Sequence, residues 1–191
     1  MRRIAIVGNI ASGKTEVEKI LKKTGFMVLD TDKVGHDLLE YSDDVKVVFK
    51  DFDILEEGKI SREKLGKIVF ANEKLLEKLN SVLHPLIAQR ILDFFEINKD
   101  QRVLFVAIPL LFEAGMEDLF DEIIFVYAND DIRLERLIRR NGYTREYALK
   151  RMNAQIPQQE KISKADFVIN NEGTLADLED QTMQLLTNHS F

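Results

Sequence analysis

The segment from Gly8 to Thr15 constrains the fold of this 191-residue chain more than any other feature. It reads GNIASGKT and fits the pattern G-x-x-x-x-G-K-[ST], a glycine-rich turn that wraps phosphate groups. The apolar residues 3–7 precede it and predict a strand, and residues 16–23 follow it with the apolar spacing of a helix. Strand, loop and helix in this order are the context that the motif requires. The pattern predicts a nucleotide-binding α/β domain.

The residue types in this loop suit a bound triphosphate. Gly8 and Gly13 permit backbone torsions and a close phosphate approach that a Cβ atom would obstruct. Successive N–H groups and the helix N-terminus then face the β-phosphate. Lys14 is expected to reach the β- and γ-phosphate oxygens, and the Thr15 hydroxyl is expected to ligate Mg²⁺.

Composition argues against several other classes of protein. The formal net charge is −6, whereas non-specific nucleic-acid binding depends on neutralising phosphates with cations. There is no cysteine, which excludes disulfides and thiolate chemistry. The longest apolar run, residues 103–112, is shorter than the roughly 20 residues of a membrane span. We expect a cytoplasmic protein with a small-molecule substrate and with no nucleic-acid, membrane or obligate protein partner.

Five short apolar segments alternate with helical stretches along the chain. The expected strands are residues 3–7, 26–30, 103–107, 122–127 and 167–169. The expected helix ends are Gly25 and Gly142, and the expected N-caps are Asp130, Thr144 and Thr174. Continuous apolar strands of this kind are typical of a parallel sheet with helices on both faces. The sequence predicts a three-layer α/β fold of the P-loop NTPase type, with a five-stranded parallel sheet.

About seventy residues separate Asp30 from Val103, whereas a minimal crossover needs about a dozen. Helical patterns occupy residues 43–49, 61–70, 73–82 and 86–97, with a polar turn at residues 56–58. We expect a helical substrate lobe over about residues 33–100, inserted where ligands bind at the carboxyl ends of the strands. A purely structural insertion is the alternative. The core is then expected over residues 1–32, 101–130 and 164–191.

Asp30-Thr31-Asp32 ends the second expected strand, at the same sheet edge as the phosphate loop. In phosphoryl transfer a carboxylate can accept the proton of the acceptor hydroxyl, and Asp32 is our candidate for this base. Asp30 would support it or lie near the metal. The alternative is that Asp32 only caps the helix expected over residues 33–40. A D-x-x-G pattern at residues 32–35 lies too close to the loop, and no N-K-x-D motif occurs, so we reject a GTPase.

Basic residues gather between positions 133 and 151. Arg133, Arg136 and Arg140 fall on one face of the helix expected over residues 131–140. Arginine binds phosphate bidentately and stays charged, and mobile helices that carry arginines can close over a bound nucleotide. We therefore expect a lid over about residues 131–163, in which Arg136 and Arg140 act on the phosphates. A solvated basic face is the alternative.

Several short motifs, in their order along the chain, together resemble the dephospho-CoA kinase family. They are the phosphate loop, DTD at 30–32, HPLI at 84–87, IPLLFE at 108–113, the arginine lid, Gln155, and ADFVINNEG at 165–173. The resemblance covers nearly the whole chain. It implies that the γ-phosphoryl group of ATP is transferred to the ribose 3′-hydroxyl of dephospho-CoA, the last step of coenzyme A synthesis, with Mg²⁺ as cofactor.

The resemblance also implies roles for individual residues. The catalytic residues would be Asp32, Lys14 and Arg140. The nucleotide contacts would be Gly8, Ala11, Ser12, Gly13, Lys14, Thr15, Glu16, Arg136, Arg140 and Asn171, with Asn170 and Gly173 near the adenine. The acceptor contacts would be Asp32, His84, Pro85, Leu110, Leu111 and Glu113, and the metal ligands would be Thr15 and Asp32. The chain departs from the family at Asn9 and Ala11, where glycine is common, and at Gly35-His36, where many members have a small residue and arginine.

Two other functions stay open on the residues alone. One is a different small-molecule or nucleotide kinase with the same core. The other is a P-loop ATPase switch, although such proteins usually have an apolar strand that ends in a metal-binding aspartate. Residues 103–107 run on to Ile108-Pro109 without one. A non-catalytic nucleotide-binding module is disfavoured because Lys14, Thr15 and Asp32 are all present.

Overall fold

The chain forms two compact units in the computed structural model, which describes residues 1–191. We call residues 1–30 and 95–191 the sheet unit, and residues 31–94 the helical unit. The helical unit is a single continuous segment between the second strand of the sheet and the strand that follows it in the chain. No helix in either unit combines the length and the apolar character needed to cross a lipid bilayer.

The sheet unit is built on five parallel strands in the order β2-β5-β1-β6-β7. They are β1 (Arg2–Val7), β2 (Val28–Asp30), β5 (Val103–Ala107), β6 (Glu122–Tyr127) and β7 (Phe167–Asn170). β1 is central: its Ile4 lies opposite Phe105 of β5 on one side and Glu122 of β6 on the other. All five expected strands are confirmed. The phosphate loop therefore leaves the middle of the sheet, where strand order diverges to both sides.

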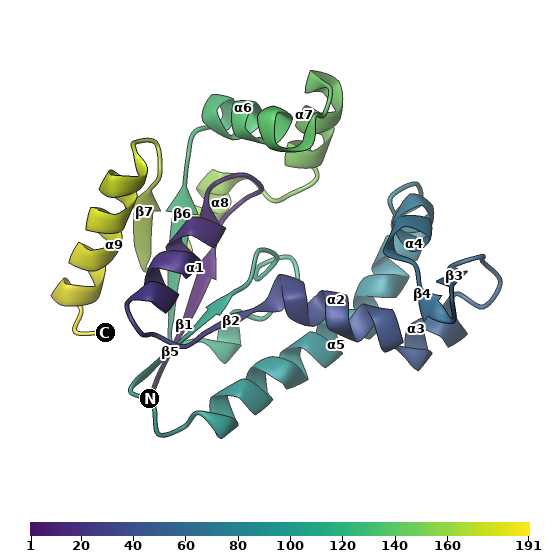
Figure 1. The fold of residues 1–191 in the computed structure, drawn as a ribbon, viewed down its shortest axis with the longest axis horizontal. Helices are drawn as coiled ribbons and strands as arrows, with labels where there is room; N and C mark the ends of the chain where they lie inside the picture. Colours follow the sequence, from purple (N-terminus) through teal and green to yellow (C-terminus); the bar gives the residue numbers. More distant parts are fainter. The chain divides into compact units, whose positions relative to one another are not determined.

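Helices cover both faces of this sheet, which confirms the expected α/β layers. They are α1 (Lys14–Lys23), α6 (Asp130–Asn141), α7 (Arg145–Asn153), α8 (Gln158–Ile162) and α9 (Leu175–Asn188), with a 3₁₀ turn η1 (Glu117–Leu119). α1 and α9 pack Val17, Leu21 and Leu178 onto one face of the sheet. Figure 1 shows α8 on the opposite side, and α6 and α7 beyond the carboxyl end of β6. Burial on both faces explains why the strands are apolar along their whole length.

Most of the expected helix ends are confirmed, and one is wrong. Gly25 and Gly142 have φ values of 94° and 67° just after α1 and α6, a left-handed conformation that glycine adopts without a Cβ clash. Thr144 caps α7, and Thr174 forms a capping box on α9. Asp130 is not the cap of α6. The preceding Asn129 is, because its side-chain oxygen accepts from the N–H of Ile132.

The helical unit has its own apolar core. Its elements are α2 (Thr31–Tyr41), α3 (Asp43–Val48), β3 (Leu55–Glu56), β4 (Lys59–Ile60), α4 (Arg62–Val69) and most of α5 (Glu73–Ile97). The buried core residues are Val45, Phe49, Ile54, Ile60, Leu65, Val69 and Leu79. The expected polar turn at residues 56–58 is confirmed as the turn of a hairpin, in which Glu57 and Gly58 have φ values of 49° and 81°. The two short strands of that hairpin were not expected.

Two further expectations in this segment are wrong. α5 runs without a break through Pro85, where two helices were expected. Proline removes one helical hydrogen bond, at about 3 kcal/mol, but buried residues such as Leu79 and Ile91 anchor the helix on both sides of it. α2 begins at Thr31, so Asp32 lies within its first turn and is not its cap.

Candidate active site

The phosphate loop connects β1 to α1, and its two motif glycines are required by protein atoms around them. A Cβ atom on Gly8 would lie 2.4 Å from the Ser12 hydroxyl oxygen and 2.9 Å from the Val126 carbonyl oxygen. A Cβ atom on Gly13 would lie 1.8 Å from the side-chain nitrogen of Asn171, and Gly13 has a φ of 102°. The torsional reason expected for both glycines thus applies to Gly13, whereas Gly8 is required by close packing.

The N-terminus of α1 differs from those of α6, α7 and α9 because no side chain caps it. The first N–H groups of a helix have no partner within the helix, and its dipole favours an anion there. Lys14, the first residue of α1, is only 8% exposed, whereas Thr15 beside it is exposed. Glu16 in the same turn pairs with Lys19 at 2.8 Å. This helix end therefore suits a bound phosphate better than the capped ends do.

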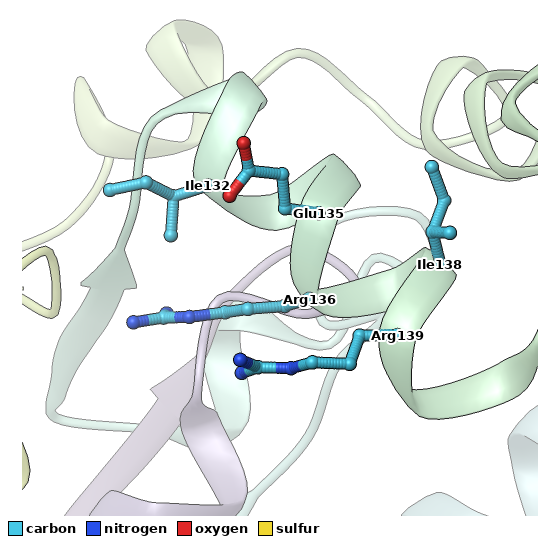
Figure 2. A pocket seen from close by; sticks show the side chains of 5 residues that line it. All are labelled: Ile132, Glu135, Arg136, Ile138 and Arg139. Atoms are coloured by element: carbon cyan, nitrogen blue, oxygen red, sulfur yellow. The ribbon is translucent and has the colours of Figure 1, made fainter.

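Asn171 and Arg136 lie against the loop from two different elements. The Asn171 side chain, directly after β7, donates to the Ser12 carbonyl oxygen at 2.8 Å. Arg136 on α6 donates to the Asn171 carbonyl oxygen at 2.9 Å and to that of Ser12 at 3.5 Å. Figure 2 shows Arg136 and Arg139 extending in the same direction from α6, where they line a hollow of about 400 Å³. The structure thus brings Arg136, Asn171 and the loop together, and their contact with a nucleotide stays a prediction.

The other two arginines of the expected row lie in different environments. Arg133 is 3% exposed and donates to the Ile10 carbonyl oxygen at 3.0 Å and to Asp130 at 2.7 Å. Its burial lowers the pKa of the guanidinium, although the Asp130 carboxylate opposes that shift. Arg140 is exposed and donates to the Asn141 side chain at 2.9 Å. Arg133 therefore supports the loop from inside the protein, and the phosphate-facing role of Arg140 stays a prediction.

The segment after β5 contains three of the expected acceptor contacts. Leu110 is 40% exposed, but Leu111 is fully buried and has no side-chain surface to offer an acceptor in this structure. Glu113 accepts from the Lys161 ammonium at 2.6 Å and from the Ile156 N–H at 3.4 Å. Lys161 is only 1% exposed. The Glu113 carboxylate therefore already has a cationic partner within the sheet unit.

The remaining expected site residues belong to the helical unit. Asp32 is exposed in the first turn of α2, two residues after β2 ends at Asp30. His84 and Pro85 lie on α5, and partial burial lowers the pKa of the His84 imidazole. That Asp32 acts as the base, and that His84 and Pro85 contact the acceptor, stays a prediction.

The metal ligands expected at Thr15 and Asp32 do not belong to any cluster of acidic or histidine side chains. The structure contains no group of three or more His, Cys, Asp or Glu residues arranged to hold a metal ion. Mg²⁺ commonly keeps several waters and binds through one or two protein groups together with substrate phosphates. A hydroxyl and a carboxylate are oxygen ligands of the kind that Mg²⁺ takes, and their role as metal ligands stays a prediction.

Sequence reasoning gave too little weight to three residues that hold the site. Arg133 was placed with the other arginines, Asn9 was noted only as a departure from a glycine-rich loop, and Lys161 was not noted. Each makes its contact with a residue more than 40 positions away in the sequence. No local pattern in the sequence signals such contacts.

Known proteins are similar to this chain over nearly its whole length. A family model described as dephospho-CoA kinase matches residues 2–177. A dephospho-CoA kinase from Carboxydothermus hydrogenoformans is 39% identical over 190 residues, which cover 96% of this chain and 92% of that protein. A solved structure from Thermus thermophilus aligns with a TM-score of 0.85 at 32% identity, over 98% of this chain and 97% of that one.

A dephospho-CoA kinase structure from Campylobacter jejuni aligns with a TM-score of 0.77 at 31% identity, over 98% of this chain and 96% of the other. The matches include the phosphate loop, the helical segment and the arginine-bearing helices, because they cover almost every residue. The chain therefore belongs to the dephospho-CoA kinase family.

Proposed function

We propose that the protein transfers the γ-phosphoryl group of ATP to the 3′-hydroxyl of the ribose of dephospho-CoA, the last step of coenzyme A synthesis. The observation that carries this proposal is the first turn of α1, which has no side-chain cap, begins with a buried lysine and follows a loop bonded to Arg136. Family membership supports the choice of acceptor.

On the nucleotide side, the loop and the start of α1 would bind the phosphates through backbone N–H groups of Ala11 to Glu16. Lys14 would direct its ammonium group to the β- and γ-phosphate oxygens, where negative charge builds up during transfer. Arg136 is bonded to the Ser12 and Asn171 carbonyl oxygens, which supports a place for the rest of the nucleotide between α6 and the end of β7.

On the acceptor side, Asp32 would accept the proton of the ribose hydroxyl. As that proton leaves, the hydroxyl oxygen forms a bond to the γ-phosphorus and the bond to the ADP oxygen breaks. The exposure of Asp32 at the start of α2 supports this role, because a general base must reach its substrate. Arg140, exposed near the end of α6, would offset charge on the transferring group.

A magnesium ion, when bound, would offset negative charge on the phosphates during transfer. Thr15 and Asp32 would hold it through a hydroxyl and a carboxylate oxygen.

Activity against a panel of acceptors tests the proposal. ATP consumption is measured with dephospho-CoA, adenosine, nucleoside monophosphates, shikimate and no acceptor. We expect rapid turnover with dephospho-CoA alone and a product phosphorylated on the ribose 3′-oxygen. Preference for another acceptor would favour a different small-molecule kinase, and hydrolysis without any acceptor would favour an ATPase switch.

The role of Asp32 is tested separately with Asp32→Asn. We expect kcat to fall by about 10² to 10⁴, the usual contribution of a general base, while the affinity for ATP stays nearly the same. Asp37→Asn, at an exposed position of the same helix, is the matched control. Near-normal turnover of Asp32→Asn would remove Asp32 as the base.

A further inference from the structure

Ile10 of the phosphate loop is held through both of its backbone polar groups by side chains that are distant in sequence. Its N–H donates to the Gln155 side-chain oxygen at 2.7 Å. Its carbonyl oxygen accepts from the buried Arg133 guanidinium at 3.0 Å. Arg133 lies near the start of the expected lid segment and Gln155 just after α7. Side chains from two separate parts of that segment, one on α6 and one after α7, therefore hold the same residue of the loop.

The neighbouring loop residues make the same connection. The Asn9 side chain donates to the Ile156 carbonyl oxygen at 2.9 Å. The side chains of Ile10 and Ala11 pack against the apolar cluster between α6 and α7, which contains Leu134, Leu137, Ala148 and Met152. The tip of the loop is thus joined to this segment by both polar and apolar contacts.

The hydrogen bonds to Ile10 matter because Ala11, the next residue of the loop, has a strained backbone conformation. Ala11 has a φ of 63°, a left-handed conformation that is strained for a residue with a Cβ atom. Such a conformation persists only where its surroundings hold it. The peptide groups on both sides of Ile10 are oriented by Gln155 and Arg133, and they set the direction in which the chain enters Ala11, Ser12 and Gly13.

We propose that Gln155 is a positioning residue for phosphoryl transfer, which fixes the Ile10 peptide and thereby the backbone that receives the phosphates. The kinetic part of this proposal rests on the proposed kinase function. Gln155 would touch neither substrate. It would act through the loop, so that the phosphate-binding geometry depends on the lid segment being seated against it.

The test compares Gln155→Met with Gln155→Glu. Gln155 lines a hollow of about 610 Å³ beside Asn9 and Arg133, so a smaller residue would admit water that could replace the lost acceptor. Methionine keeps the length of the side chain and removes the acceptor, whereas glutamate restores an oxygen in the same place. Gln159→Met is the matched control, since Gln159 is exposed and lines the same hollow without a hydrogen bond to the loop.

Three measurements are made on the purified full-length protein. For Gln155→Met we expect kcat to fall about 10- to 100-fold, the cost of a misplacement of roughly 1 Å, with KM for dephospho-CoA within about twofold of the wild type. We expect the affinity for Mg²⁺–ADP to fall about fivefold, as for one lost hydrogen bond. We expect the Ile10 amide to exchange its hydrogen at least about tenfold faster. Gln155→Glu should restore all three measurements.

Two results would overturn the proposal. One is a Gln155→Met enzyme with wild-type kcat and ADP affinity and only a lower melting temperature, which would make Gln155 structural. The other is a loss that Gln155→Glu does not repair, or that Gln159→Met shares. If the wild type does not use dephospho-CoA, the proposed function fails, but ADP affinity and Ile10 exchange need no acceptor and still decide the role of Gln155.

Discussion

The interactions that hold the phosphate loop in place differ from those that stabilise the helical unit. Loop residues Ile10 and Ser12 form hydrogen bonds with the side chains of three distant residues. These are Gln155, Arg133 and Asn171, which lie 145, 123 and 159 positions from their partners in the sequence. The helical unit is organised around an apolar core, and its ion pairs, such as Lys59–Glu40 and Lys64–Asp53, lie on the surface. Directional hydrogen bonds specify geometry, whereas apolar burial supplies stability without a preferred direction.

This difference predicts that substitutions around the loop change turnover, and that substitutions in the core of the helical unit change stability. Exposed ion pairs contribute only about 0–1 kcal/mol, so they do not alter this expectation.

The largest effect is expected at the loop itself. Lys14→Ala should lower kcat by on the order of 10³-fold or more, because the charge that develops on the phosphoryl oxygens loses its ammonium partner. Lys23→Ala, at the exposed end of the same helix, should leave kcat unchanged. Steady-state kinetics decide this, and a Lys14→Ala enzyme with substantial activity would be hard to reconcile with any P-loop mechanism.

A second pair of variants separates the two kinds of arginine on α6. Arg140→Ala should lower kcat by on the order of 10²-fold with an unchanged melting temperature, by analogy with arginines that stabilise a transferring phosphoryl group. Arg133→Met should lower kcat and, unlike Arg140→Ala, should also lower the free energy of unfolding by about 1–3 kcal/mol, because the Ile10 carbonyl loses its hydrogen-bond donor.

Chemical denaturation of both variants measures the free energy of unfolding, and steady-state kinetics measure kcat. A stability change in Arg140→Ala without a kinetic one would return Arg140 to a solvated basic face.

In the helical unit, Leu65→Ala should lower the free energy of unfolding by about 2–5 kcal/mol, because Leu65 is 1% exposed within the apolar core. Turnover of the folded enzyme should change little. Leu55→Ala, at a leucine that is 43% exposed, should cost no more than about 0.5 kcal/mol. A large fall in kcat for Leu65→Ala well below its melting temperature would break the distinction between the two regions.

The smallest effect concerns pH and His84. Burial lowers the pKa of His84 in the folded state, so the unfolded chain binds a proton more readily. Stability should therefore fall as the pH drops below the ordinary histidine pKa of about 6.5. His84→Gln should reduce this fall between about pH 7.5 and 5.5. Equal pH dependence in the wild type and in His84→Gln would exclude the His84 contribution.

Local patterns predicted the elements that local forces create. The five strands, the left-handed Gly142 and the Thr144 cap follow from residue type and spacing within a few positions. Residue type could not decide between Asp130 and Asn129 as the N-cap of α6, because both residue types cap helices well. Asn129 caps α6, whereas the Asp130 carboxylate accepts hydrogen bonds from the side chains of Arg133 and Gln158. The continuity of α5 through Pro85 was missed because burial along the flanking turns outweighs a local penalty.

By itself the sequence determined the phosphate loop, the parallel sheet around it and the family to which the chain belongs, because these depend on motifs and on the apolar spacing of short segments. Only the tertiary structure decided that Arg133 and Gln155 hold the loop, that Glu113 is paired with Lys161, and that Leu111 is buried. These facts depend on which distant residues meet, and a side chain carries no local signal of its partner.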